Sequence, residues 1–260
     1  MFPEERRRRI LDLVDRRGRV SVKDLSHRFD VSDVTIRADL KALADEGMVV
    51  RTHGGAVPGD RSLRYLSLSK RLKKQVAEKR RIGERGASLV SDGEAIFLDS
   101  SSTALAVARN LRRHHDLTII TNALAVAQDM LDVQDVTVLM VGGRLHRDTA
   151  SLVGGLEIEK QFGNLNIQRG FFGAHGISIE QGLTDVSVQE AHVKRSLVDR
   201  CQEVVAVVDG TKWKCTGLAS FARLEQIDRV ITDAGAPSGA VERVRALGPD
   251  VLVVPTYRQS

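Results

Sequence analysis

The sequence has few cysteines, no metal-binding pattern of histidines and no long apolar run. Cys201 and Cys215 are its two cysteines and form no CxxC motif, and the seven histidines show no HExxH or similar spacing. We therefore expect reduced thiols, no structural metal and no cofactor. The longest apolar runs, such as VTVLMV from Val136, are too short to span a bilayer, and the N-terminus MFPEERRRRI lacks the apolar core of a signal peptide. These absences predict a cytoplasmic protein that does not contact a membrane.

The positive charge is concentrated in the first third of the chain. The net charge of the 260 residues is +5. Residues 1–85 contain 22 basic and 13 acidic residues, a net charge of +9, whereas residues 86–260 contain 17 and 21, a net charge of −4. A basic N-terminal part on an acidic body indicates that the N-terminal part meets a polyanion.

Residues 3–57 show the pattern of three short helices followed by a hairpin. The first helix is expected over residues 3–17, and the second begins at Ser21 with Asp24 at the capping-box spacing. The third is expected from Ser32 to Glu46, directly after the short turn FDVS. Two helices joined by so short a turn predict a helix-turn-helix.

The third helix has one apolar and one basic face. At about 100° per residue, Ile36, Leu40 and Leu43 fall on one buried side. The opposite side combines small residues with long basic donors, which suits the major groove of DNA. A solvated charged face is the alternative for each basic residue alone. The residues of this helix predicted to bind DNA are Ser32, Val34, Thr35, Arg37, Ala38 and Lys41.

The segment after the third helix predicts a wing. MVVRTHGGAV, Met48 to Val57, is typical of two short strands around Gly54-Gly55. Arg51 and His53 would be carried on this hairpin, and we predict that they also contact DNA.

These residues resemble a known family. SDVTIRADL, Ser32 to Leu40, followed by EGMVVRTHGGAV, resembles the DeoR family of bacterial transcriptional repressors and its N-terminal winged helix-turn-helix. Ala38 stands where many members have a basic residue. The resemblance implies double-stranded operator DNA as a partner and a homo-oligomer, which fits the symmetry of helix-turn-helix operators.

A linker and a basic helix are expected next. PGDRS indicates a flexible join, and the pattern KRLKKQVAEKRRIGER predicts a helix within residues 64–85 whose charge could be only a solvated face. Because this helix is the covalent connection between the two parts, it is our candidate coupling element. Arg71 and Lys79 match the family pattern and are candidates for coupling or effector binding. The expected division is therefore a DNA-binding domain at 1–57, a linker and helix start at 58–74, and an α/β domain at 75–260.

Apolar strands alternate with helical segments from Ala95 onward. The strands expected are AIFLD, LTIITN, VTVLMVGG, RGFFGA, EVVAVVD, RVITDA and VLVVP. This alternation predicts a mainly parallel sheet covered by helices, and polar residues gather where the strands end. Ligands of open α/β sheets bind beyond the carboxyl ends of the strands. The strand-end residues predicted to bind an effector are Asp99, Ser100, Ser101, Ser102, Thr103, Thr121, Asn122, Gly142, Gly143, His175, Asp209 and Lys212.

The hydroxyl loop between Asp99 and Ala104 leads directly into a helix. The N–H groups and positive dipole end of that helix, beside four hydroxyl side chains, would be a favourable seat for a phosphate. The alternative is that the serines and Thr103 only cap the helix.

A second candidate lies on the helix expected from Ser187 to Cys201. Val193 and Leu197 define its inward face, and Glu190 and Lys194 fall in the middle of that face. A Glu–Lys pair four residues apart is most often a surface salt bridge. A pair directed at the core is costly unless it is hydrogen-bonded, so we predict that Glu190 and Lys194 bind the effector.

The body also resembles the DeoR family and, through it, the fold of sugar-phosphate isomerases such as ribose-5-phosphate isomerase. The matching segments are IFLDSSST, TN at Thr121, VGG at Val141, FGAHGI at Phe172, EAHVKR at Glu190 and DGTKW at Asp209. The resemblance implies a sugar phosphate held by the hydroxyl loop.

The sequence is compatible with a ligand-sensing regulator, an enzyme or a nucleoid-binding protein. His175 stands where the isomerases have an Asp, and Ser101 stands where glycine is common, so a retained pocket with an altered catalytic set favours a sensor without catalytic residues. We therefore predict a transcriptional regulator, a repressor released from its operator by a phosphorylated sugar or a related metabolite. A sugar-phosphate isomerase with a DNA-binding head, using Glu190 as base, is the alternative. A nucleoid-binding protein without effector would not need the inward Glu190 and Lys194.

Overall fold

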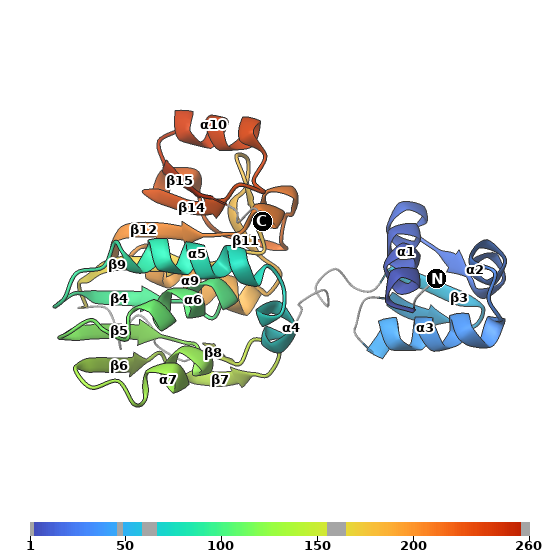
Figure 1. Cartoon of the computed structure of the whole chain (residues 1–260), viewed down its shortest axis with the longest axis horizontal. Coiled ribbons are helices and arrows are strands. Elements are labelled where there is room, and N and C mark those ends of the chain that lie inside the picture. Colours follow the sequence, from blue (N-terminus) through green and yellow to red (C-terminus); the bar gives the residue numbers. More distant parts are fainter. Residues whose placement is uncertain (1–2, 46–48, 59–66, 155–164, 256–260) are drawn as a thin grey trace. The chain divides into compact units, whose positions relative to one another are not determined.

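The computed structural model describes residues 3–45, 49–58, 67–154 and 165–255. The chain divides into two compact units, Met1–Tyr65 and Leu66–Ser260 (Figure 1). The linker predicted at 58–74 lies partly outside the described residues, as does the predicted end of the third helix at Glu46.

The first unit is a winged helix-turn-helix. Its second helix begins as predicted, because the side chain of Ser21 accepts a hydrogen bond from the backbone N–H of Asp24. The three helices pack around a small apolar core that includes Ile10, Val14 and Leu25. The helices are α1 (Pro3–Arg17), α2 (Val22–Phe29) and α3 (Asp33–Asp45), and the strands are β1 (Val20–Ser21), β2 (Val49–Thr52) and β3 (Gly55–Pro58).

The wing differs from the prediction in two details. Its strands turn at His53-Gly54, since Thr52 already pairs with Gly55. A third strand, β1, which was not predicted, pairs with β3 and places Val20 opposite Ala56. A Cβ on Gly55 would lie 1.9 Å from the carbonyl oxygen of Val20. Gly55 therefore permits the close approach of β1 and β3 instead of forming the turn.

The second unit begins with two helices, not with the single basic helix predicted within 64–85. α4 (Leu68–Leu72) and α5 (Val76–Ala87) are separated at Gln75, which has a positive φ of 49°. The Lys79 ammonium donates hydrogen bonds of 2.7 Å to the carbonyl oxygens of Arg71 and Lys74. Lys79 thereby satisfies carbonyls at the end of α4 and fixes the corner between the two helices.

A seven-stranded sheet forms the centre of the second unit, and all its neighbouring strands are parallel (Figure 1). The seven predicted strands are confirmed. Their spatial order is β15-β14-β12-β9-β4-β5-β6. Their bounds are β4 (Ala95–Leu98), β5 (Leu117–Thr121), β6 (Val136–Met140), β9 (Ile167–Phe172), β12 (Cys201–Val207), β14 (Arg229–Asp233) and β15 (Asp250–Val254).

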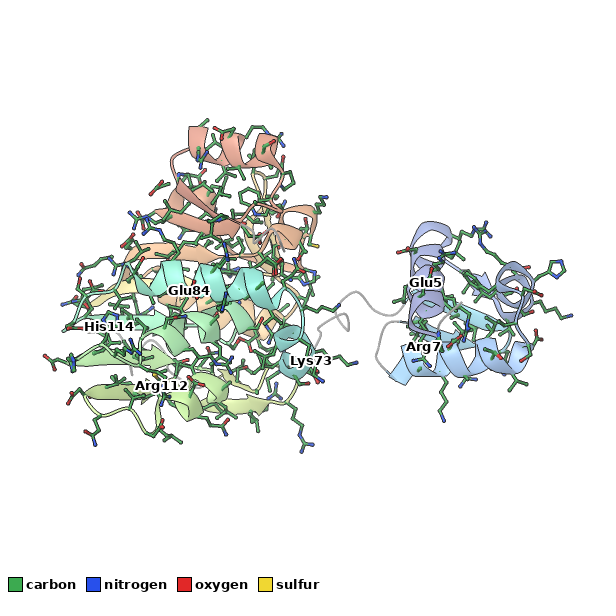
Figure 2. The ribbon with its side chains drawn as sticks, viewed as in Figure 1. Glu5, Arg7, Lys73, Glu84, Arg112 and His114 are labelled. Carbon is green, nitrogen blue, oxygen red and sulfur yellow. The ribbon has the colours of Figure 1, made fainter. Side chains whose placement is uncertain are left out.

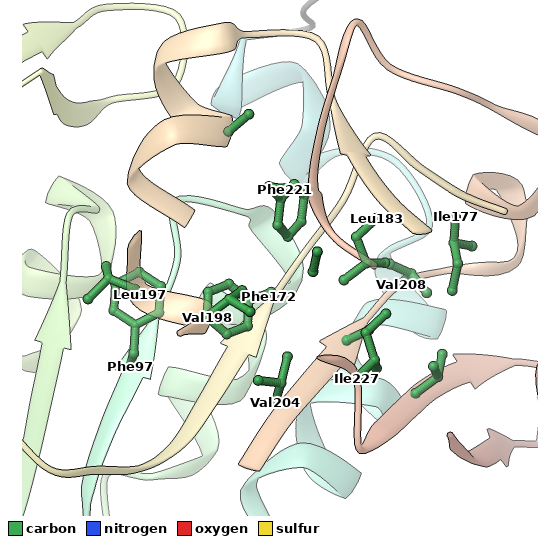
Figure 3. Close-up of a cluster of buried hydrophobic side chains, with 14 of the residues drawn as sticks. Phe97, Phe172, Ile177, Leu183, Leu197, Val198, Val204, Val208, Phe221 and Ile227 are labelled. Carbon is green, nitrogen blue, oxygen red and sulfur yellow. The ribbon is translucent and has the colours of Figure 1, made fainter. Parts of the chain in front are cut away.

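Helices pack on both faces of this sheet because its side chains alternate between the faces. Ile96 and Leu98 belong to a core with α5 and α6 (Ser102–Asn110). Phe97 points to the other face, where it packs on Phe172 with ring centroids 5.3 Å apart (Figure 3). Helices α9 (Val188–Val198) and α10 (Ser238–Ala246) contribute to that second core, and α7 (Leu124–Met130) contributes to the first.

Several elements were not predicted. Cys201 begins β12, so the helix predicted from Ser187 to Cys201 ends at Val198. A short 3-10 helix, η2 (Gly210–Lys214), follows β12. The additional strands are the antiparallel pair β7 (Gly143–His146) and β8 (Ser151–Gly154) and the small antiparallel sheet β10 (Gly176–Ser178), β11 (Gly182–Asp185) and β13 (Ala219–Ala222).

Candidate functional site

The recognition helix α3 presents the face that its sequence predicted. Ile36, Leu40 and Leu43 are buried, whereas Arg37, Ala38 and Lys41 are exposed. Val34 is 76% exposed and lies on the same face of the helix as Arg37 and Lys41. Thr35 is partly buried, and its backbone N–H and hydroxyl both contact the Ser32 hydroxyl at the start of the helix. The face can therefore contact base edges and phosphates without unpacking the unit.

The wing is equally accessible, because Arg51 and His53 are both exposed. Arg51 lies within β2 and His53 lies in the turn. They lie on the same unit as α3, as predicted.

Two arginines of α1 hold the recognition helix. Asp39 of α3 is 2% exposed and accepts hydrogen bonds from Arg6 Nε at 2.5 Å and from Arg7 Nε at 2.9 Å. Figure 2 shows the side chain of Arg7 on α1. In the structure they anchor α3 to α1.

At the carboxyl edge of the large sheet, Asp99 and Lys194 form the centre of a buried ionic group. Lys194 Nζ lies 2.9 Å from Asp99 Oδ2 and 2.8 Å from Asp185 Oδ2, and it also donates to the carbonyl oxygen of Gly173. Burial by itself raises the pKa of Asp185, but the charge and hydrogen bond of Lys194 outweigh it, so the pKa stays below its usual value. Asp99 accepts further bonds from the backbone N–H groups of Ser101 and Gly173. These groups fix the hydroxyl loop against the end of β9.

Glu190 is the centre of a second buried group. Its carboxylate is fully buried and accepts hydrogen bonds from Ser100 Oγ at 2.9 Å, from Asn122 Nδ2 at 3.3 Å and from Ser151 Oγ. Ser151 Oγ lies 2.5 Å from the Thr149 hydroxyl. Glu190 and Lys194 both point inward as predicted, and each has protein partners of its own. The network joins β4, β5, α9 and the β7–β8 hairpin.

The hydroxyl loop caps the helix and binds a neighbouring side chain, and its role as a seat for a phosphate stays a prediction. Ser101 caps α6, since its Oγ accepts a hydrogen bond from Ala104 N, and Ser100 binds Glu190. Ser102 and Thr103 are buried at the start of the helix. Thr121 has an internal role, because its hydroxyl donates to the Leu98 carbonyl and accepts from Ala123 N.

A cluster of cations lies beside this loop. Burial lowers the pKa of Lys79 to about 8, and Asp209 partly opposes that shift, while Lys212, Arg71 and Lys74 act with burial. Arg71 Nη2 also lies 3.3 Å from the carbonyl oxygen of Ser100. Asp209 caps η2 by accepting from Thr211, and Lys212 is a half-buried residue of that helix. Arg71, Lys74, Lys79 and Lys212 therefore lie near one another, and Asp209 and Asp185 are carboxylates that interact with members of this group.

The remaining predicted effector residues lie around these groups. Gly142 lies between β6 and β7, and Gly143, which is exposed, is the first residue of β7. His175 is partly buried, and its backbone N–H donates to the Thr184 carbonyl. The role of these three residues in effector binding stays a prediction.

Sequence reasoning missed Asp185, Thr149 and Ser151, which are all buried in the two groups. Asp185 closes the short strand GLTD, and the two hydroxyls belong to the unpredicted β7–β8 hairpin. The hydroxyls of TAS, Thr149 to Ser151, were the available signal, but nothing in the sequence indicated that the hairpin folds back to Glu190.

Two further properties concern the described residues. No group of His, Cys, Asp and Glu side chains among them is arranged to hold a metal ion. No helix among the same residues is both long and apolar enough to cross a membrane.

A winged helix-turn-helix followed by an α/β unit with polar groups along the carboxyl edge of its sheet is the architecture of a ligand-sensing DNA-binding regulator. Residues 6–61 match the family model described as the DeoR-like helix-turn-helix domain, and residues 74–234 match the DeoR C terminal sensor domain. The chain therefore belongs to the DeoR family and is a transcriptional regulator, as its sequence predicted.

Curated relatives agree over nearly the whole chain. The regulator GolR of Listeria innocua is 37% identical over 90% of this chain and 91% of its own length. A putative aga operon transcriptional repressor of Escherichia coli O157:H7 is 32% identical over 96% and 93%. The glycerol-3-phosphate regulon repressor of Escherichia coli K12 is 31% identical over 93% and 95%.

Solved structures resemble the chain more distantly. Ribose 5-phosphate isomerase A from Methanocaldococcus jannaschii has 15% identity and a TM-score of 0.39, covering 52% of this chain and 53% of its own. A translation initiation factor eIF-2B from Pyrococcus horikoshii has 14% identity and a TM-score of 0.43, covering 81% and 72%. With TM-scores below 0.5, neither resemblance supports a conclusion about activity.

Proposed function

We propose that this regulator represses transcription through α3 and the wing, and that a phosphorylated sugar or related metabolite bound at the carboxyl edge of the large sheet releases it from its operator. The observation that carries the proposal is the contact of Arg71 with the hydroxyl loop, together with the neighbouring cations Lys79 and Lys212. The name of one relative, a glycerol-3-phosphate regulon repressor, supports a phosphorylated effector.

A phosphate fits this part of the edge for two reasons. The N-terminus of α6 begins within the hydroxyl loop, and its dipole favours an anion. The nearby cations would form charge-assisted hydrogen bonds with phosphate oxygens. A bound dianion would also relieve the mutual repulsion of the lysines, which contributes to the low pKa of Lys79.

Helix α4 is the proposed coupling element, in place of the longer helix that the sequence predicted. It contacts the effector region twice, because the Leu68 N–H donates to the Asp148 carbonyl of the β7–β8 turn and Arg71 binds the Ser100 carbonyl. The hydroxyls at positions 100–103 are buried, so an effector that reaches the loop must change its surroundings. Because α4 follows the linker from the DNA-binding unit, a shift of its contacts would be transmitted to that unit.

The regulator is proposed to act as a homo-oligomer in the cytoplasm. Helix-turn-helix proteins bind operators whose two half-sites mirror the two-fold symmetry of a dimer.

A thermal-shift screen of sugar phosphates and inorganic phosphate against the purified chain tests the effector. A ligand that binds only the folded state raises the melting temperature. We expect at least one phosphorylated compound to do so and to lower operator affinity. A screen in which no phosphorylated compound shifts the melting temperature would contradict the proposal.

A further inference from the structure

Asn122 has an atom that the protein leaves unsatisfied. In the described part of the chain, Asn122 Oδ1 is buried and has no hydrogen-bond partner, and the residue as a whole is 1% exposed. The amide nitrogen donates to the Leu152 carbonyl and to Glu190 Oε2, both at 3.3 Å. Because both partners are acceptors, exchanging the nitrogen and oxygen of the amide would lose both bonds.

An acceptor buried without a donor destabilises the folded state, and a ligand donor would remove that cost. The atom lies at the carboxyl end of β5, the edge at which open α/β sheets bind their ligands. Its position therefore points to a hydrogen-bond donor supplied by the effector.

The neighbouring Glu190 carboxylate is also a hydrogen-bond acceptor. The carboxylate of Glu190 offers about four lone-pair positions, and its described donors are Ser100, Asn122 and Ser151. Two oxygens of the carboxylate and Oδ1 of the amide thus form an acceptor corner, defined here by Asn122 and Glu190. Hydroxyl groups of a ligand would be attracted to this corner, whereas a ligand carboxylate would be repelled by Glu190.

Ser100 connects this corner to the cations. Its carbonyl oxygen lies 3.3 Å from Arg71 Nη2, and its hydroxyl donates to Glu190 at 2.9 Å. An anion-attracting side and a hydroxyl-attracting side are therefore separated by a single residue. A small molecule with a phosphate at one end and hydroxyls at the other would span both.

We infer that Asn122 Oδ1 accepts a hydrogen bond from an effector hydroxyl and that Asn122 and Glu190 together select phosphorylated compounds with a neutral, hydroxylated end over phosphorylated sugar acids. The inference rests on the proposed function, because it requires the phosphate to occupy the cationic side.

Ligand sets matched in carbon skeleton test this selection. The full-length chain is titrated calorimetrically with ribose 5-phosphate, ribitol 5-phosphate and 5-phosphoribonate, with the corresponding glucose, glucitol and gluconate 6-phosphates, and with inorganic phosphate. We expect a neutral member of one set to bind at least about tenfold more tightly than its acid, the factor that one hydrogen bond of about 1.4 kcal/mol provides. Equal or tighter binding of the acid would overturn the inference while leaving the proposed function intact. If neither phosphate nor any set binds, the proposed function fails and the inference fails with it.

Substitutions assign the selection to its residues. Asn122→Ala should lower the affinity for the neutral compound about tenfold and leave the affinity for inorganic phosphate unchanged. An unchanged affinity for the neutral compound would overturn the role of Asn122. Thr184→Val is the matched control, because Thr184 is also buried but its hydroxyl bonds only to Gly176 and Gly217 in the described structure. If Asn122→Ala melts at too low a temperature to be titrated, Glu190→Gln provides the test. Removal of the Glu190 charge should reduce the ratio of the affinity for the neutral compound to the affinity for the sugar acid. An unchanged preference in Glu190→Gln would overturn the inference.

Discussion

Arg6 Nε lies 2.5 Å from Asp39 Oδ2, and both side chains are almost completely buried. The pair ties the first helix of the DNA-binding unit to the recognition helix, and Arg7 adds a second bond to the same carboxylate. The orientation of the exposed face of α3 therefore depends on a carboxylate on its opposite side.

Asp39→Ala should destabilise the DNA-binding unit by about 3–5 kcal/mol, because it removes a buried carboxylate that is paired with the charge of Arg6. Amide hydrogen exchange of α1 and α3 in the full-length chain measures this loss. Glu5→Ala, which removes an exposed ion pair with Arg9, is the control and should cost less than about 1 kcal/mol. Equal protection in Asp39→Ala and the parent would show that the pair does not hold α3.

Arg37→Ala and Lys41→Ala should each weaken operator binding by about 1–3 kcal/mol, because exposed cations on α3 are placed to contact bases or phosphates. Folding should be retained, since neither side chain is in the core. Binding is measured at fixed salt, because phosphate contacts depend on ionic strength. Arg85→Ala, a change of an exposed cation in the second unit, controls for net charge. If both α3 variants bind the operator as tightly as the parent, α3 is not part of the DNA interface.

The periodic patterns of the sequence predicted the parts of the fold that repeat. Stepping around α3 and α9 identified Leu40 and Glu190 as inward residues because each helix has a regular turn. The seven parallel strands followed from their apolar runs. Contacts between segments distant in sequence could not be predicted in this way. Asp185 reaches Lys194 from β11, and Ser151 reaches Glu190 from a hairpin that has no distinctive pattern.

The corner at Gln75 shows a different limit. The residues on both sides favour a helix, but Gln75 adopts a positive φ and Lys79 satisfies the freed carbonyls at the end of α4. Helix propensity therefore predicted one continuous helix, whereas the chain turns at Gln75 and the Lys79 side chain bonds to the carbonyls before it. The partners of Lys194 and Glu190 likewise show that an inward charged pair can be satisfied within the protein.

Effector binding at pH 8 should be accompanied by proton uptake. Burial lowers the pKa of Lys79 to about 8, so part of its population is neutral at this pH, and a nearby phosphate dianion would raise the pKa again. Calorimetry in buffers with different ionisation enthalpies measures the uptake. Lys79→Arg should abolish it, because a guanidinium remains charged. A binding enthalpy independent of the buffer in the parent would place the phosphate away from Lys79.

The protein should not isomerise sugar phosphates. A catalytic base must take a proton from the substrate carbon, whereas the Glu190 carboxylate is held by three side-chain donors and is proposed only to attract effector hydroxyls. Incubation with ribose 5-phosphate and hexose 6-phosphates, followed by NMR, should show no product above background. Turnover that disappears in Glu190→Gln would instead identify an enzyme.

The most direct test of the account is the concentration of effector needed to release the operator in Lys212→Ala, compared with the parent and with Lys214→Ala. Lys212 is half-buried and its charge contributes to the low pKa of Lys79, whereas Lys214, on the same short helix, is exposed. Using the compound identified by thermal shift, we predict that all three proteins bind the operator equally without effector. Lys212→Ala should then require at least about tenfold more effector for release, since it loses one charge-assisted bond to the phosphate. Release of Lys212→Ala at the parental concentration would contradict a phosphate-binding site at this edge of the sheet.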